Sequence, residues 1–223
     1  EFVETLRYFG RQIERLGIEL RLNTRADAAL LDDQGFDEVI IATGVTPRDP
    51  RIPGQDNPKV LSYVDVLRRD KPVGKTVAVI GAGGIGFDVS EFLVHAEVPE
   101  RPNPDEPGAE EFFRHWGVDT DLDRRGGVEG LESNFPSPAR QIYLLQRKTT
   151  KPGAGLGKTT GWIHRTSLKK FGVEMLSGVI YDRIDDQGLH IRIGDAERCL
   201  QVDNVIICAG QIPNRELSEA LDQ

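Results

Sequence analysis

The pattern of apolar and polar positions along the chain predicts a series of helices and strands. An apolar stripe at helical spacing opens the chain and consists of Phe2, Leu6, Phe9, Ile13 and Leu16. This stripe predicts an amphipathic helix that ends near Gly17. Residues 18–24 (IELRLNT) alternate between apolar and polar, and residues 36–44 (FDEVIIATG) contain a short apolar run. Both patterns indicate strands, and the second strand is expected to be buried.

The next elements surround a glycine-rich turn. After a proline-rich connector, Ser62 is suited to cap a short helix over residues 63–69, and residues 76–80 form an apolar strand. The helix after the turn has one apolar face made of Ile85, Val89, Phe92, Leu93 and Ala96. The remaining expected elements are a helix near 109–117, a strand at 141–146, a helix at 162–171, a strand at 172–179, a meander at 182–202 and a buried strand at 204–210. Strands that alternate with helices predict an α/β fold, here a Rossmann-like, three-layer domain with a parallel sheet and a β-meander.

One segment of the sequence occurs twice. FDEVIIATGVTPR (36–48) aligns without gaps with VDNVIICAGQIPN (202–214), at an offset of 166 residues (202 − 36). Buried strands draw on few residue types, so the shared Val-Ile-Ile could arise by chance, but the Asp before it and the Gly-x-x-Pro after it would not. We therefore expect two related nucleotide-binding units. A glycine turn precedes only the second copy, so the chain is expected to begin partway through the first unit.

The turn between the strand at 76–80 and its helix has the spacing G-x-G-x-x-G. Gly81 permits the tight turn, Gly83 lets backbone amides approach a pyrophosphate, and Gly86 allows close packing of helix on strand. The unpaired amides at the helix start favour an anion. Such a turn can also be a plain connection, but the flanking strand and one-faced helix favour a dinucleotide site.

The residues at the end of the following strand indicate which dinucleotide is bound. An acid there would accept a hydrogen bond from the ribose 2′-hydroxyl of NADH, whereas basic residues would pair with the 2′-phosphate of NADPH. The sequence reads YLLQRKTTK, with Arg147 and Lys148 where the ribose is expected and no carboxylate. NADPH is therefore the predicted nucleotide. The residues assigned to its site are Gly81, Ala82, Gly83, Gly84, Ile85, Gly86, Arg147, Lys148, Lys158, Ala209 and Gly210.

Charge is unevenly distributed along the chain, whose formal net charge is −8. Residues 97–139 contain eleven acids and four arginines, whereas residues 140–170 contain eight Lys or Arg and no acid. Because a crossover helix normally needs about 15 residues, the 61 positions from Gly86 to Arg147 indicate that residues 97–139 are an insertion. Two interpretations stay open: a lid or docking surface over the cofactor, or a tolerated surface excursion.

Several other function classes are excluded or disfavoured. The acidic balance argues against nucleic acid, and no apolar run approaches the ~18 residues of a membrane helix. The charged start of the chain and the two unpaired cysteines favour the cytoplasm. GAGLGKTT fails the P-loop pattern because Pro152 stands where its first glycine is required. The four histidines are scattered, so we assign no catalytic residue and no metal ligand.

These motifs carry a resemblance to known flavoproteins. ATGVTPR and CAGQIPN, with VAVIGAGGIGFD between them, resemble the flavoproteins with two dinucleotide-binding domains. The runs KVLSYVDVLR, GKTVAVIGAGGIGFDVSEFL, QIYLLQRKTTKPGAGLGKTTGWIHRTSLKKFGVEML and VDNVIICAGQIPN are similar to the C-terminal half of bacterial NADPH-dependent 2,4-dienoyl-CoA reductases. This resemblance implies a larger enzyme with an FMN barrel, an iron-sulfur cluster, and FAD and NADPH domains, in which hydride passes from NADPH to FAD.

The resemblance also implies a domain plan. Residues 1–70 would be a partial FAD domain without its glycine turn, residues 71–214 the NADPH domain, and residues 215–223 the return to the FAD domain. Ala42, Thr43 and Gly44 would lie beside FAD. The missing flavin and barrel domains of a parent chain are then the expected partners, and the fragment alone would be inactive. Two alternatives stay open: a related barrel flavoprotein such as an amine dehydrogenase, and a non-catalytic nucleotide-sensing or docking module.

Overall fold

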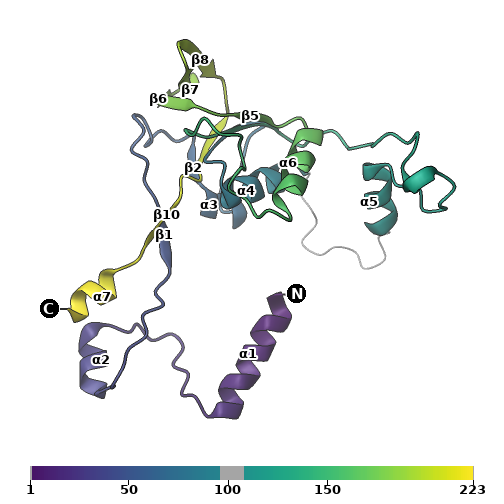
Figure 1. The fold of residues 1–223 in the computed structure, drawn as a ribbon. Coiled ribbons are helices and arrows are strands. Elements are labelled where there is room, and N and C mark those ends of the chain that lie inside the picture. Colours follow the sequence, from purple (N-terminus) through teal and green to yellow (C-terminus); the bar gives the residue numbers. More distant parts are fainter. Residues whose placement is uncertain (1, 96–107, 223) are drawn as a thin grey trace. The chain divides into compact units, whose positions relative to one another are not determined.

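The computed structural model describes residues 2–95 and 108–222, and the chain divides into two compact units (Figure 1). Residues 47–212 form the larger unit, and the residues before 47 and after 212 form the smaller one. By its contacts, the connector at 47–70 belongs to the larger unit; the expected domain plan, with a boundary at 70/71, stays a prediction. No helix within the described ranges is both long enough and apolar enough to span a bilayer.

A five-stranded parallel sheet forms the centre of the larger unit. Its strands, in spatial order, are β2 (Val60–Ser62), β9 (Asn204–Ile207), β3 (Thr76–Ile80), β4 (Gln141–Leu145) and β5 (Glu174–Leu176). All four neighbouring pairs are parallel. This sheet confirms the predicted α/β class. The strand order reverses at β3, because β4 lies on one side of it and β9 on the other, and ligands of such sheets bind at this switch point.

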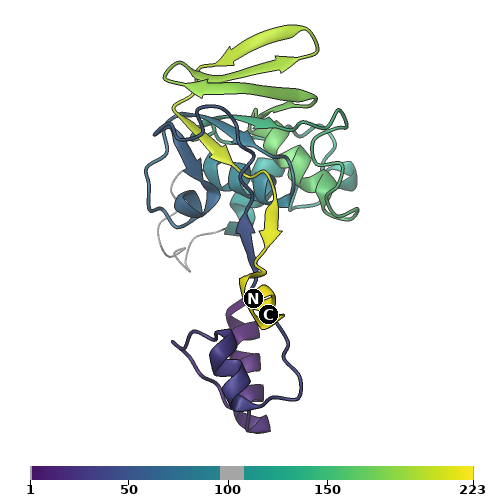
Figure 2. The ribbon, with the colours of Figure 1, turned by 90° about the vertical axis from the view of Figure 1, so that its left-hand side faces the viewer.

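Helices and a β-meander cover opposite faces of the sheet (Figure 2). The helices are α3 (Tyr63–Leu67), α4 (Gly84–Val94) and α6 (Gly161–Lys170). The meander consists of β6 (Val179–Asp185), β7 (Gly188–Ile193) and β8 (Ala196–Leu200), paired antiparallel in that order. The three layers confirm the Rossmann-like architecture with a meander. Ser62 caps α3 as predicted, since its hydroxyl accepts a hydrogen bond from the Asp65 amide and the Asp65 carboxylate accepts one from the Ser62 amide.

Alternation along β3 produces two hydrophobic cores. Val77 and Val79 point to the helices, whereas Ala78 and Ile80 point to the meander, and all four are buried. The apolar face expected for α4 needs one correction. Phe87 is buried there, but Phe92 is 37% exposed, because a helix has 3.6 residues per turn and Phe92 lies off the stripe that contacts the sheet. Ala96 lies outside the described residues.

The described part of the predicted insertion packs beside α6. It contains α5 (Gly108–Trp116) and a 3₁₀ turn, η1 (Arg125–Gly127). Phe135 makes edge contacts with Trp116 and Phe171, with ring centroids 5.1 and 5.2 Å apart. The Lys170 ammonium lies 6.0 Å from the Phe135 ring. Aromatic contacts therefore hold this segment against the end of α6.

Asp203 fixes the start of β3 relative to β9. Its carboxylate accepts hydrogen bonds from the amides of Lys75 and Thr76 and from the Thr76 hydroxyl, at 2.8, 2.8 and 2.9 Å. The hydrogen bond from the Thr76 amide is the largest cause that lowers the pKa of Asp203. Asp203 is also the aspartate that the sequence repeat shares with Asp37.

We expect Asp203→Asn to lower the stability of the chain at pH 7 by about 1 kcal/mol, or roughly 2–4 °C in Tm. Because the folded pKa of Asp203 is lowered, its contribution exists above the unfolded pKa of about 3.9 and is lost as pH falls through the folded pKa. The difference in Tm between wild type and variant should therefore shrink between pH 5 and pH 3. Thermal unfolding followed by circular dichroism would measure it, and a pH-independent difference would contradict the prediction.

The smaller unit contains three helices and no buried residue among those described. They are α1 (Phe2–Leu16), α2 (Ala28–Gln34) and α7 (Glu216–Leu221). The expected first helix is confirmed, and Gly17 after it has a φ of 64°. The strand predictions at 18–24 and 36–44 were wrong: neither segment is a strand, and Ile40 is 92% exposed. A strand needs a neighbour for its amides and a layer for its apolar face, and the described residues of this unit supply neither.

The two copies of the sequence repeat pair with each other. β1 (Val45–Pro47) and β10 (Gln211–Pro213) form a two-stranded sheet. The Asn214 amide donates to the Gly44 carbonyl at 3.0 Å, and the Arg48 amide donates to the Gly210 carbonyl at 2.9 Å. The two hydrogen bonds join equivalent residues of the two copies, since Gly44 corresponds to Gly210 and Arg48 to Asn214. Gly44 and Gly210 both have positive φ, 76° and 104°. The last five residues of the two copies, 44–48 and 210–214, therefore pair in a twofold-like way, whereas residues 38–41 of the first copy are not a strand although their counterparts 204–207 form β9.

Candidate functional site

A cleft of about 680 Å³ opens at the carboxyl end of β3. It lies at the switch point of the sheet, where the glycine turn 81–84, the loop after β4 and the end of β9 meet. Its lining residues are Pro50, Arg51, Ile52, Pro53, Ile80, Gly81, Ala82, Gly83, Gly84, Gln146, Arg147, Lys148, Thr150, Ala154, Gly155, Leu156, Val179, Ile180, Tyr181, Cys208, Ala209 and Gly210. The cleft therefore contains most of the residues assigned to the nucleotide from sequence.

Glycine is required at two positions of this turn for steric reasons, and at two others it leaves space open. Gly81 has a φ of 114°, and a Cβ on it would lie 2.2 Å from the Cys208 carbonyl oxygen. A Cβ on Gly86 would lie 1.7 Å from the Gly81 carbonyl oxygen. By contrast, Cβ atoms on Gly83 and Gly84 would meet nothing within 4 Å. Gly81 and Gly86 hold the backbone together, whereas Gly83 and Gly84 leave open space into which an extended ligand fits.

The start of α4 gives this open space a positive character. Its N-cap is Gly83, which makes no side-chain capping hydrogen bond. The first amides of the helix therefore lack side-chain acceptors, and the helix dipole adds partial positive charge. Gly84 lies at this end and lines the cleft. A pyrophosphate fits both the space and the charge.

Two basic side chains follow β4 at one edge of the cleft. Arg147 and Lys148 are exposed, and Gln146 shapes their loop because its side-chain amide donates to the carbonyls of Lys148, at 3.0 Å, and Thr150. Tyr181 lies nearby on β6. Burial raises the pKa of its phenol, and the positive charge of Arg147 acts in the opposite direction. The phenol is therefore uncharged at neutral pH.

The connector between β1 and β2 forms a wall that the sequence did not indicate. Arg51 lines the cleft in a left-handed conformation, φ 54°, and its amide donates to the Asp49 carboxylate at 2.8 Å. The Ile184 amide donates to the Pro53 carbonyl at 2.8 Å, and a Cβ on Gly54 would lie 2.0 Å from the Ile184 carbonyl oxygen. The contact of this connector with β6 thus fixes its position at the side of the cleft. The only sequence signal was the proline-rich composition of the connector.

The remaining assigned residues lie in different places. Ala209 and Gly210 line the cleft from the end of β9. Ile85 packs against the core on the helix side of the sheet. Lys158 is exposed and does not line the cleft. Ala42, Thr43 and Gly44 belong to the smaller unit, where the Thr43 hydroxyl donates to the Asn214 carbonyl at 2.8 Å.

The charge of the lining suits an anion and offers no acid-base group. Among the described residues, the lining contains Arg51, Arg147 and Lys148 but no aspartate, glutamate or histidine. Burial raises the pKa of the Cys208 thiol to about 12, so this thiol stays protonated at neutral pH. No grouping of metal-ligating side chains occurs within 2–95 and 108–222. The charge of this lining therefore suits an anionic ligand.

A second cavity of about 690 Å³ lies at the other end of α4. Its lining includes Asp70, Asp88 and Glu91 together with His95 and His164. The lining also includes Arg69, Lys71 and Arg140, so its charges are mixed, whereas the lining of the cleft at β3 contains cations and no carboxylate. The cavity also lacks the glycine turn, so the cleft at β3 is the candidate nucleotide site.

Comparison with known proteins supports this assignment of the fold. A metal reductase of Desulforamulus reducens (strain ATCC BAA-1160 / DSM 100696 / MI-1) is 23% identical over 235 residues, which cover 99% of this chain and 32% of that protein. A 2-naphthoyl-CoA reductase in complex with 2-naphthoyl-CoA has a TM-score of 0.70 and 24% identity, covering 98% of this chain and 27% of that one. The 6-hydroxypseudooxynicotine amine oxidase of Pseudomonas geniculata N1 has a TM-score of 0.64 and 20% identity, covering 92% and 26%.

This chain thus spans about a third or less of the length of each of these relatives. At these identities the solved structures show a shared fold and no more. The family itself is shown by a sequence model described as pyridine nucleotide-disulphide oxidoreductase, which matches residues 14–223. The chain belongs to the pyridine nucleotide-disulphide oxidoreductase family.

Proposed function

We propose that residues 47–212 bind NADPH as part of a flavoprotein oxidoreductase. The observation that supports this most is the cleft at β3, which combines a glycine turn, the start of α4 and an acid-free basic rim. Its volume and its three cations suit a dinucleotide with phosphate groups at two positions. The family implies a flavin and a nicotinamide nucleotide, and NADPH would supply the hydride that the flavin accepts.

Different residues would hold different parts of the nucleotide. The turn 81–84 and the first amides of α4 would hold the pyrophosphate, while Arg147 and Lys148 would pair with the 2′-phosphate. The apolar side chains Ile52, Leu156 and Val179 also line the cleft and would exclude water from the bases. The chain itself would bind and orient the nucleotide, since the cleft lining contains no aspartate, glutamate or histidine among the described residues.

The preference for NADPH can be tested on the 223-residue chain by titration with NADPH and with NADH, followed by nucleotide fluorescence. Charge-assisted hydrogen bonds contribute about 1.5–3 kcal/mol. We therefore expect the Kd for NADPH to be roughly 10–100 times lower than that for NADH. Titration at low and high salt serves as a control, because the difference should narrow as salt screens the phosphate contact. Equal affinities for the two nucleotides would overturn the assignment of Arg147 and Lys148.

We further propose that the smaller unit is part of an FAD domain and that the parent protein reduces 2,4-dienoyl-CoA thioesters. The exposed apolar residues of this unit, such as Phe2, Leu6 and Ile40, are the side chains that further strands and a helix layer would cover. The twofold relation between β1 and β10 supports a second, related nucleotide domain. The substrate rests on the sequence resemblance. A gene that encodes no glycine turn and no clustered cysteines upstream of Glu1 would overturn this parent.

A further inference from the structure

Tyr181 contributes a phenol hydroxyl to the cleft at β3. Its side chain is half-buried and lines the cleft, and its ring packs against the hydrophobic cluster between the sheet and the meander. Burial raises the pKa of the phenol, and the positive charge of Arg147 acts in the opposite direction. The Arg147 guanidinium therefore lies within electrostatic range of the phenol oxygen. A cation and a neutral hydrogen-bond donor thus share this edge of the cleft.

Backbone hydrogen bonds fix the start of β6 against the loop that follows β4. The Gly178 amide donates to the Lys148 carbonyl at 2.9 Å. The Val179 amide donates to the Gln146 carbonyl at 3.0 Å. Alternate residues of a strand point to the same face, and Val179 and Tyr181 both line the cleft. The strand therefore holds the phenol beside the basic edge of the cleft.

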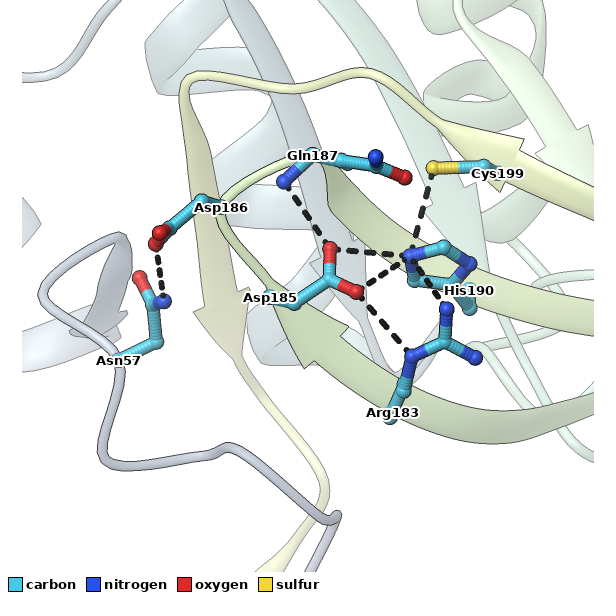
Figure 3. Close-up of polar contacts among 7 residues, drawn as sticks. All are labelled: Asn57, Arg183, Asp185, Asp186, Gln187, His190 and Cys199. Atoms are coloured by element: carbon cyan, nitrogen blue, oxygen red, sulfur yellow. Dashed lines mark hydrogen bonds and ion pairs between the residues drawn. The ribbon is translucent and has the colours of Figure 1, made fainter.

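Polar contacts hold the other end of β6 (Figure 3). The Asp185 carboxylate accepts a hydrogen bond from the Arg183 guanidinium at 3.1 Å and lies 2.8 Å from Nε2 of His190. In the turn after β6, the Asp186 carboxylate accepts a hydrogen bond at 3.1 Å from the side-chain amide of Asn57, which belongs to the connector. β6 is therefore fixed at both ends, which holds the phenol between them in place.

The hydroxyl of Tyr181 makes no hydrogen bond to any group of residues 2–95 and 108–222. By contrast, the hydroxyls of Tyr63 and Tyr143 accept hydrogen bonds from the side-chain amides of Gln211 and Gln141, at 3.2 and 2.9 Å. A buried tyrosine hydroxyl usually finds a hydrogen-bond partner. The donor of Tyr181 is thus available to a ligand that occupies the cleft.

We propose that Tyr181 is a further specificity-determining residue, whose hydroxyl donates a hydrogen bond to the 2′-phosphate that pairs with Arg147. This inference rests on the proposed binding of NADPH in the cleft. A phosphate monoester has three terminal oxygens, so it can accept hydrogen bonds from a guanidinium and a hydroxyl together. A hydrogen bond to an ionised acceptor is roughly twice as strong as one between neutral groups. The hydroxyl therefore favours NADPH over NADH, which has a neutral 2′-hydroxyl in this place.

Tyr181→Phe tests the proposal, because it removes the hydroxyl and keeps the ring. In the 223-residue chain, we expect the Kd for NADPH to rise about tenfold and the Kd for NADH to change by less than about twofold. Fluorescence titration measures both constants. The Tm without nucleotide should stay within about 1 °C of the wild type, because the hydroxyl has no partner among the described residues. A purely structural tyrosine would instead lower Tm and leave the ratio of the two constants unchanged.

Tyr143→Phe is the matched control, because this tyrosine does not line the cleft. Its Kd values for both nucleotides should stay within about twofold of the wild type. Combining Tyr181→Phe with Arg147→Ser gives a second test. Since both groups would contact one phosphate, the double variant should raise the Kd for NADPH by less than the product of the two single effects.

Two results for Tyr181→Phe would overturn the proposal. One is an unchanged Kd for NADPH. The other is an equal rise for both nucleotides, because the hydroxyl would then contact a part that NADPH and NADH share. Failure of the wild-type chain to bind NADPH would overturn the proposed function together with this inference, and it is distinguishable because it shows before any variant is compared.

Discussion

Replacing Gly86 with alanine should destabilise residues 47–212 by about 3 kcal/mol or more. The added Cβ would lie 1.7 Å from the Gly81 carbonyl oxygen and 3.5 Å from Cδ1 of Leu144. The first contact is with backbone, which cannot rotate away as a side chain does. The helix would have to move off β3, and the buried packing of Phe87 and Val89 against the sheet would open. Urea unfolding followed by circular dichroism measures the loss.

Gly84→Ala is the matched control, because it makes the same chemical change two residues earlier. A Cβ on Gly84 would meet nothing within 4 Å, and alanine is a better helix former than glycine. Its free energy of unfolding should therefore stay within about 0.5 kcal/mol of the wild type or rise slightly. If the two variants had similar stability, the close approach of α4 to the turn would not exist as described.

The elements that sequence patterns located best are those that bury residues on both sides. Residues 76–80 were predicted as a strand and form β3 over the same residues, because every position after Thr76 is buried between two layers. Such strands leave a continuous apolar run in the sequence. The strands predicted at 18–24, from alternation, and at 36–44, from an apolar run, are not strands here. The periodicity of a segment indicates which of its residues could be buried. It does not indicate whether the rest of the chain supplies a layer that buries them.

Site residues whose roles depend on neighbours close in sequence could be predicted, whereas those placed by contacts distant in sequence could not. The roles of Gly81 and Gly86 follow from a turn between adjacent elements, so their spacing reveals them. Arg51 could not be found in this way, because its place in the cleft depends on the docking of Gly54 against Ile184, a contact 130 residues apart in sequence. Lys158 was assigned from its position in a glycine-rich loop; it is not among the residues that line the cleft, and its role toward the nucleotide stays a prediction.

The paired copies of the repeat connect the fold to the proposed function. Gly44 and Gly210 occupy equivalent positions, and both accept a backbone hydrogen bond from the other copy. Gly210 also lines the cleft of the nucleotide domain. Its counterpart Gly44 would then face the corresponding ligand of a second domain, which is the place proposed for FAD. This relation supports the proposal that Ala42, Thr43 and Gly44 lie beside the flavin.

Arg147→Ser should raise the Kd for NADPH by roughly 10–100-fold and leave the Kd for NADH nearly unchanged. The guanidinium is exposed at the cleft edge and has a fork geometry that matches a phosphate monoester. Serine removes both the charge and the paired donors. NADH has no 2′-phosphate, so it loses nothing specific. Fluorescence titration of wild type and variant with both nucleotides measures the four dissociation constants.

Lys158→Ala is the control for Arg147→Ser, because it removes a nearby positive charge that does not line the cleft. Its effect on NADPH should stay within about threefold, since an exposed charge at a distance is screened by salt. If Lys158→Ala weakened NADPH as much as Arg147→Ser, the phosphate would lie near the loop at 151–160 instead. If Arg147→Ser weakened both nucleotides equally, Arg147 would contact the pyrophosphate, and the selectivity for NADPH would need another residue.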